Sequence, residues 1–284
     1  MEKLVDMINS SILKTAIAVF ALSASILPAL AESPSKPSAP IAKGEKYAVV
    51  FGISKFQDSA AHLDSGAADA EDFYKYLTKK ANFAPGHVIL LTDKKADRTS
   101  IYKLLGETFI PTLRPEDLVV IYFSTLGTPA KDDYGHINYL VASDTKMNQL
   151  FAFGIDMQNL PQIVMMRTRC NNVVFIINSS YSGAMEVKTK SLFRTAKPIP
   201  PATLIASCGA DQTSVTGKNT KTSIFNKRLI EALQIKGNAT TIGEAFTYLK
   251  SKVQTDVKAD SGVLQTPVLK CETMNLKIGA PAGR

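Results

Sequence analysis

A short run of hydroxyl and amide side chains, from Asn178 to Ser182, follows directly after the apolar stretch 173–177. A buried parallel strand that ends in this way delivers side chains to the rim of its sheet, where the active sites of open α/β folds lie. A serine hydroxyl acts as a nucleophile when a nearby base takes its proton. Ser180 is therefore a candidate nucleophile, and the neighbouring serines can equally fill a tight turn after the strand.

The other reactive side chains are few and far apart in the sequence. The chain has three cysteines and three histidines, namely Cys170, Cys208, Cys271, His62, His87 and His136. They show no C-x-x-C pair and no metal-ligand spacing, so we expect neither a metal site nor another cofactor. Cys208, at the end of an expected strand, is either a thiol nucleophile or a buried small residue. His136 is either a base for Ser180 or a surface histidine.

Alternating strand and helix patterns provide the frame for these residues. Apolar runs predict strands at residues 47–53, 87–91, 118–123, 173–177 and 203–207. Apolar residues at helical spacing predict helices with buried faces within 70–77, 101–108, 225–233 and 242–249, the last beginning at Thr240 or Thr241. This alternation predicts an α/β fold in which helices cover both faces of a mostly parallel sheet.

The N-terminal 44 residues are typical of an export signal followed by a linker. Within residues 1–31, lysines precede a short apolar run, and residues 29–31 (ALA) match an A-x-A cleavage site. The run is short for a membrane span, so we expect cleavage and an exported, periplasmic or extracellular protein without a transmembrane segment. An uncleaved anchor is the alternative. Residues 32–44 are rich in proline and serine and predict a linker.

The composition is that of an ordinary folded protein. Of its 284 residues, 45% are hydrophobic and 20% are charged, which is enough for a substantial core. The formal net charge is +8, but the lysines are scattered and no basic stripe alternates with aromatic residues. We therefore expect no nucleic-acid binding. An anion-binding or envelope-associated role would rest on charge alone.

Several blocks follow one another in a recognisable order: KYAVVFGISKFQD, GAADAEDFYKYL, ILLTDKKADRTSIYKLL, PEDLVVIYFSTLGT, NYLVASD and VVFIINSSYSG. In this order they resemble the caspase-like cysteine peptidases, in particular the bacterial metacaspase (orthocaspase) branch. The resemblance continues less strongly through LIASCGADQ, FNKRLIEAL and LQTPVLK. It implies a caspase–hemoglobinase-like three-layer α/β/α sandwich and a cysteine-endopeptidase ancestry. It also implies a large-subunit region at 45–185, a connector at 186–201 and a small-subunit-like region at 202–284 that completes the same domain.

Both catalytic positions of that family carry other residues in this chain. The family motif F-S-G-H-G lies at the end of the third strand, and its histidine is the general base. Here the motif reads FSTLG, so Leu126 stands at the histidine position. The motif D-A-C-H-S-G carries the nucleophile, and here NSSYSG places Ser180 at the cysteine and Tyr181 at the following histidine. A leucine cannot titrate, and a serine needs a base to become nucleophilic. The resemblance therefore implies an inactive relative of cysteine peptidases.

Other parts of the family's site also map onto this chain. The resemblance places the oxyanion-hole donors at the backbone amides of Gly127 and Ser180, which depend on no side chain. It places Asn178 where metacaspases carry an acid of the substrate pocket. Tyr181 is a candidate to stack on a ligand or to fill the cleft. Asp211 is a candidate to attract a cation there or to cap a turn.

The resulting hypothesis is a pseudoprotease that holds a peptide or protein ligand in a degenerate cleft, as a binding or regulatory module. The alternative is a weak hydrolase or endopeptidase that uses Ser180 or Cys208. The sequence predicts no particular oligomeric state.

Overall fold

The computed structural model describes residues 44–187, 201–218 and 220–279. The expected signal peptide and nearly all of the linker lie outside the described residues, as does most of the connector 186–201. The described residues belong to one compact unit. Within them, no helix combines the length and the apolar character needed to cross a membrane.

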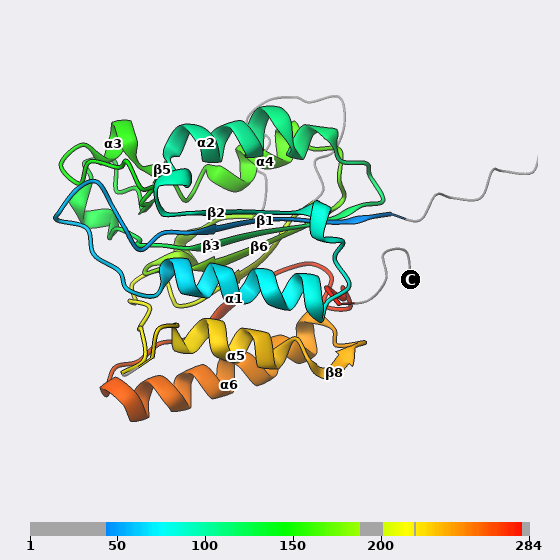
Figure 1. The fold of residues 1–284 in the computed structure, drawn as a ribbon. Coiled ribbons are helices and arrows are strands. Elements are labelled where there is room, and N and C mark those ends of the chain that lie inside the picture. Colours follow the sequence, from blue (N-terminus) through cyan, green and yellow to red (C-terminus); the bar gives the residue numbers. More distant parts are fainter. Residues whose placement is uncertain (1–43, 188–200, 219, 280–284) are drawn as a thin grey trace, which may run out of the picture. The chain divides into compact units, whose positions relative to one another are not determined.

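A six-stranded sheet forms the centre of the fold, in the order β2-β1-β3-β6-β7-β9 (Figure 1). Its strands are β1 (Lys46–Gly52), β2 (Val88–Thr92), β3 (Leu118–Ser124), β6 (Asn172–Asn178), β7 (Thr203–Ala206) and β9 (Val268–Lys270). Neighbouring strands run parallel except for β9, which is antiparallel to β7. The first five are the strands expected from the sequence, to within one residue at each end. The edge strand β9 was not among them.

Helices cover both faces of this sheet, which confirms the α/β/α arrangement (Figure 1). One face carries α1 (Gly66–Lys79), α5 (Ile224–Ala232) and α6 (Ile242–Ser261), and the other carries α2 (Arg98–Lys103) and α4 (Leu160–Arg167). Because both faces are covered, every residue of β3 is buried, and its side chains alternate between two separate apolar clusters.

Short elements complete the described fold. A two-stranded antiparallel ladder joins β4 (Tyr139–Leu140) to β5 (Ile155–Asp156), with the single-turn helix α3 (Leu150–Phe153) between them. The segment β8 (Ile235–Asn238) lies between α5 and α6. Single 3₁₀ turns occur at Pro85–His87, Asp93–Lys95, Ile110–Thr112, Ala130–Asp132 and Ser182–Ala184.

Local sequence signals explain where α6 begins and where α2 ends. Thr241 and Glu244 form a capping box at the start of α6, so the expected start at Thr240 or Thr241 resolves to Thr241. The predicted helical face within 101–108 was wrong at its end. There α2 gives way to a wider π-helical turn, and Thr108 is exposed. Gly106, a poor helix former, lies in this turn.

A buried lysine ties the beginning of β1 to the end of the described chain. The ammonium of Lys46 donates hydrogen bonds to the carbonyl oxygens of Ala81, Ile278 (3.2 Å) and Gly279 (3.4 Å). It also lies 4.6 Å from the centre of the Phe83 ring. Burial lowers the pKa of Lys46 to about 8, because the charged form has lost its water.

Candidate functional site

The carboxyl ends of β3 and β6 lie side by side and bring their following loops together. Ser124 is the register partner of Asn178, and the Thr125 N–H donates to the Asn178 carbonyl oxygen (3.2 Å). Beyond this point, Gly127 approaches the backbone of Ser180 so closely that a Cβ on Gly127 would lie 2.0 Å from the Ser180 carbonyl oxygen. Only a glycine permits this approach without a backbone shift.

The β4 segment holds the loop after β3 in place. The N–H of Val141 donates to the carbonyl oxygen of Leu126 (3.0 Å), and the hydroxyl of Thr125 donates to the carbonyl oxygen of Val141 (2.6 Å). The N–H of Thr128 donates to the carbonyl oxygen of Tyr139 (2.9 Å). The position of Leu126 is therefore set by backbone contacts that do not involve its own side chain.

The turn after β6 contains a residue with a left-handed backbone. Tyr181 has φ of 60°, a conformation that few residues other than glycine adopt. Its N–H donates to the carbonyl oxygen of Gln212 (2.8 Å), and the hydroxyl of Ser207 donates to the carbonyl oxygen of Ser179 (3.0 Å). Contacts with the segment after β7 thus hold this turn at the sheet edge.

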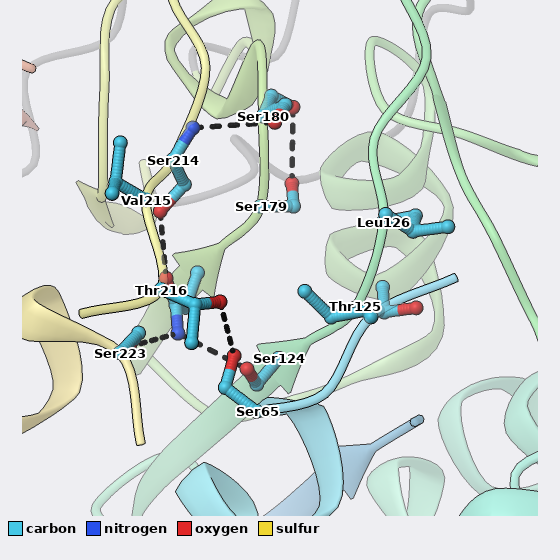
Figure 2. Close-up of a pocket in the computed structure, with 12 residues that line it drawn as sticks. Ser65, Ser124, Thr125, Leu126, Ser179, Ser180, Ser214, Val215, Thr216 and Ser223 are labelled. Carbon is cyan, nitrogen blue, oxygen red and sulfur yellow. Dashed lines mark hydrogen bonds between the residues drawn. The ribbon is translucent and has the colours of Figure 1, made fainter. Parts of the chain in front are cut away.

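A small polar pocket lies between these loops (Figure 2). Its lining residues are Leu63, Ser65, Ser124, Thr125, Leu126, Asn178, Ser179, Ser180, Ser214, Val215, Thr216 and Ser223. Most of them carry a hydroxyl group, and the Leu126 side chain is directed away from Ser180 in Figure 2. The pocket encloses about 40 Å³, which is room for about three water molecules.

A buried carboxylate, Asp69 on α1, lies behind this pocket. Its Oδ1 accepts from the Ser223 N–H (2.8 Å), and its Oδ2 accepts from the Ser124 hydroxyl (2.9 Å). The amide nitrogen of Asn178 donates to the same Oδ2 (2.8 Å). That amide also approaches the hydroxyl oxygens of Ser124 (3.0 Å) and Ser223 (2.9 Å). The Asn178 carbonyl oxygen accepts from the Ser214 hydroxyl (3.1 Å).

The electrostatics of the pocket depend on Asp69. Its side chain is fully buried, and burial raises its pKa to about 6. The hydrogen bonds from Ser223, Ser124 and Ser65 act in the opposite direction, because they stabilise the ionised carboxylate. At neutral pH the carboxylate is therefore ionised, and its charge is compensated by neutral donors alone.

Asp69 was not expected from the sequence, although a signal was present. Asp69 lies four residues before Phe73 and eight before Leu77, so it shares the buried face of α1 with them. An acid on the apolar face of a helix is rare unless its carboxylate is paired or hydrogen-bonded. That position alone marks Asp69 as a functional or structural polar site.

Two further residues that were not expected from the sequence, the buried Gln265 and the half-buried Gln212, hold the wall of the pocket. Gln265 donates from its amide nitrogen to the Ser207 carbonyl oxygen (2.9 Å), and its Oε1 accepts from the Val215 N–H (2.9 Å). Gln212 Oε1 accepts from the N–H groups of Gly209 (3.0 Å) and Thr266 (2.9 Å). These bonds connect the segment that follows α6 to the segment that follows β7.

Ser180, the candidate nucleophile, is half-buried at the rim of the pocket. Its Oγ accepts a hydrogen bond from the Ser214 N–H (3.2 Å), and within the described residues this is the only partner of the hydroxyl. His136, the candidate base, is exposed on the loop before β4. The backbone amides of Gly127 and Ser180 have no hydrogen-bond partner among the described residues.

The remaining candidates lie outside the pocket. Cys208 is fully buried, with its Sγ 3.3 Å from the Ser179 carbonyl oxygen and 3.1 Å from that of Gln212. Burial raises the pKa of this thiol, which keeps it protonated and unreactive. Tyr181 is half-buried and Asp211 is exposed, and neither of them lines the pocket. In the described part of the chain, no group of three or more His, Cys, Asp or Glu side chains is arranged to hold a metal.

Comparisons with known proteins support the fold. The family model described as "Caspase domain" matches residues 45–278. A Geobacter sulfurreducens protein of known structure is 17% identical, with a TM-score of 0.59, and the match covers 82% of this chain and 97% of that one. Caspase-1 from Spodoptera frugiperda is 18% identical, with a TM-score of 0.55, and the match covers 85% of this chain and 92% of that one. A structure of its pro-form has the same identity and TM-score, with coverage of 88% and 98%. No curated protein sequence matches the chain significantly.

Proposed function

Because the chain belongs to the caspase domain family, whose model spans residues 45–278, we propose that it is a catalytically inactive relative of peptidases. In this proposal it works as a binding or regulatory module that holds a peptide or protein segment in the polar pocket. The metacaspase-like order of its sequence blocks supports a place in the bacterial branch of the family.

One observation carries the proposal, namely the surroundings of the Ser180 hydroxyl. Its partner is a backbone N–H, which donates a hydrogen bond and cannot take a proton. Leu126 occupies the position where the family has its base, and it cannot titrate. A serine without a base is a poor nucleophile. When a member of such a catalytic unit is lost, only the background from binding and oxyanion stabilisation remains, about 10³–10⁴-fold over water.

The features that would bind a ligand do not depend on the lost side chains. The Gly127 and Ser180 amides have no partner among the described residues, so they can donate to a ligand carbonyl. Gln265 and Gln212 brace the pocket wall through hydrogen bonds to the Val215 and Thr266 N–H groups. A preformed polar site binds at a lower entropic cost than one that must first be ordered.

Export is a separate part of the proposal and rests on residues 1–31. The apolar run and the A-x-A site before Glu32 support cleavage after Ala31 and a periplasmic or extracellular location. Mass spectrometry of the protein from its native host tests this. A mature chain that begins at Glu32 is expected, and an intact N-terminus on membrane-bound material would contradict it.

The decisive experiment for inactivity compares the wild type with Ser180→Ala and Cys208→Ala. Each protein is incubated with fluorogenic peptides that carry Arg, Lys or Asp before the scissile bond, and with an activated ester. We expect no turnover above background for any of the three. Turnover by the wild type that disappears in Ser180→Ala would replace the proposal with a serine hydrolase. Turnover that disappears only in Cys208→Ala would place the nucleophile on that thiol.

A further inference from the structure

The polar groups around the pocket are already paired with one another. The Asp69 carboxylate accepts from a backbone N–H, a hydroxyl and the Asn178 amide. The Asn178 carbonyl oxygen accepts from the Ser214 hydroxyl. Elsewhere in the lining, the Ser65 and Thr216 hydroxyls lie 3.2 Å apart and form a further pair, as Figure 2 shows. A ligand therefore meets a carboxylate whose two oxygens already accept hydrogen bonds from the protein.

Asn178 takes the place that a cation from a ligand would otherwise fill. Its amide nitrogen lies 2.8 Å from Asp69 Oδ2, at the distance of a direct hydrogen bond. An incoming ammonium or guanidinium would have to displace this amide before it reached the carboxylate. It would also lose its own water without gaining a free acid, and the burial of an unpaired charge is costly.

Size leads to the same conclusion as charge. The pocket encloses about 40 Å³, room for about three waters. A methyl or hydroxymethyl group can replace those waters, whereas a side chain of four or more heavy atoms, such as leucine, lysine or arginine, exceeds their number. Because hydroxyls both donate and accept, the hydroxyls of Ser65, Thr216 and Ser180 in the pocket lining can reorient toward a small polar group.

From these contacts we infer that the pocket accepts a small uncharged side chain, alanine or serine, of a peptide ligand, and that Asn178 determines this preference. The inference rests on the proposed function, because it names the ligand class of the same site. Lysine, arginine, aspartate and large apolar side chains are excluded at the ligand position that enters the pocket.

Position-scanning peptide libraries test the inference on the mature chain. The probes are fluorescein-labelled tetrapeptide amides in which one position is set to Ala, Ser, Leu, Asp, Lys or Arg and the others are mixed. Binding is measured by fluorescence anisotropy for the wild type, for Asn178→Asp and for Asn172→Asp. The last variant is the matched control, because it makes the same change at the other end of the same strand, away from the pocket.

We expect the wild type to prefer Ala or Ser at one ligand position by about tenfold or more, the usual effect of a group that does not fit a small pocket. Asn178→Asp should move the preference at that position to Lys or Arg, because two adjacent carboxyl groups favour a cation. Asn172→Asp should keep the wild-type preference.

A wild-type preference for Lys, Arg, Asp or Leu would overturn the inference, and this measurement needs no variant to fold. An unchanged preference in Asn178→Asp would also overturn it, since Asn178 would then not determine the choice. Cleavage of the probes with the Ala or Ser preference intact would refute the proposed inactivity and leave the inference standing. Absence of any positional preference in the wild type would refute the inference and the proposed binding of a peptide side chain in this pocket, but not the proposed inactivity.

Discussion

Replacement of Asn178 by aspartate should make the stability of the fold strongly dependent on pH. The Asn178 amide nitrogen lies 2.8 Å from Asp69 Oδ2, so the variant places a second carboxyl group against a fully buried one. Two negative charges at this distance repel by roughly 6 kcal/mol at an effective dielectric constant of about 20. The pair will therefore hold one proton between its two carboxyl groups over a wide pH range, as coupled carboxyl pairs do.

The direction of the pH effect follows from the proton balance between the folded and unfolded states. In the wild type the pKa of Asp69 is raised to about 6, above the value of about 3.9 expected when unfolded. The folded state binds the proton more tightly, so this group contributes stability that is present below about pH 4. That stability, roughly 3 kcal/mol, is lost as the pH rises to about 6. In Asn178→Asp the higher pKa of the pair lies above 6, so the decline continues by about 1.4 kcal/mol per pH unit.

Urea denaturation from about pH 5 to about pH 8 measures this effect as a free energy of unfolding at each pH. Asn178→Ala is the control, because it removes the same hydrogen bonds without adding a charge, and its pH dependence should be weaker than that of Asn178→Asp because only one donor to Asp69 is lost. The double variant Asp69→Asn/Asn178→Asp restores one acid and one amide, so its pH slope should return toward that of the wild type. A gap between the wild type and Asn178→Asp that stays the same at every pH would refute the reasoning.

Three further predictions concern other parts of the structure. Between pH 8 and about 10.4, the unfolding free energy of the wild type should rise by roughly 3 kcal/mol relative to that of Lys46→Met. The reason is that burial lowers the folded-state pKa of Lys46 to about 8, so the penalty for burying its charge disappears as the side chain deprotonates. Urea denaturation profiles that stay parallel over this pH range would contradict this. Gly127→Ala should destabilise the protein by about 1–3 kcal/mol in thermal or urea unfolding, because the new Cβ would lie 2.0 Å from the Ser180 carbonyl oxygen. Gly86→Ala is the control and should be nearly neutral, because a Cβ at Gly86 would have no neighbour within 4 Å. A thiol reagent should label the half-buried Cys271 well before the fully buried Cys208, and labelling of both at one rate would show that the turn around Cys208 opens readily.

The central strands could be predicted from the sequence because burial on both faces leaves a simple mark. β3 and β6 appear as continuous apolar runs, which few other elements of this size produce. The edge strand β9 has three residues, all partly exposed, and therefore carries no such mark. The two-residue strands β4 and β5 are set by contacts with the loop after β3 rather than by their own sequence pattern.

The site divides in the same way between local and distant information. The location of Leu126, Gly127 and Ser180 at the carboxyl end of the sheet could be predicted, because they follow shortly after recognisable strands. Asp69 and Gln265 could not, because their roles depend on contacts between segments far apart in the chain. Asp69 meets the Ser223 N–H across 154 residues, and Gln265 meets the Ser207 carbonyl oxygen across 58. No local pattern specifies partners at such separations.

The contact between Lys46 and the end of the chain has a consequence for the order of folding. The Lys46 ammonium meets the Ile278 carbonyl oxygen across 232 residues, so nearly the whole chain must be made before this contact can form. β1, β2 and β3 can pair earlier, because their partners are close in sequence. During synthesis Lys46 can contact the Ala81 carbonyl oxygen and the Phe83 ring early, but it keeps part of its water until its later partners arrive. Its full desolvation is delayed until residues 278 and 279 can reach it, which makes the seating of this segment a late step of folding.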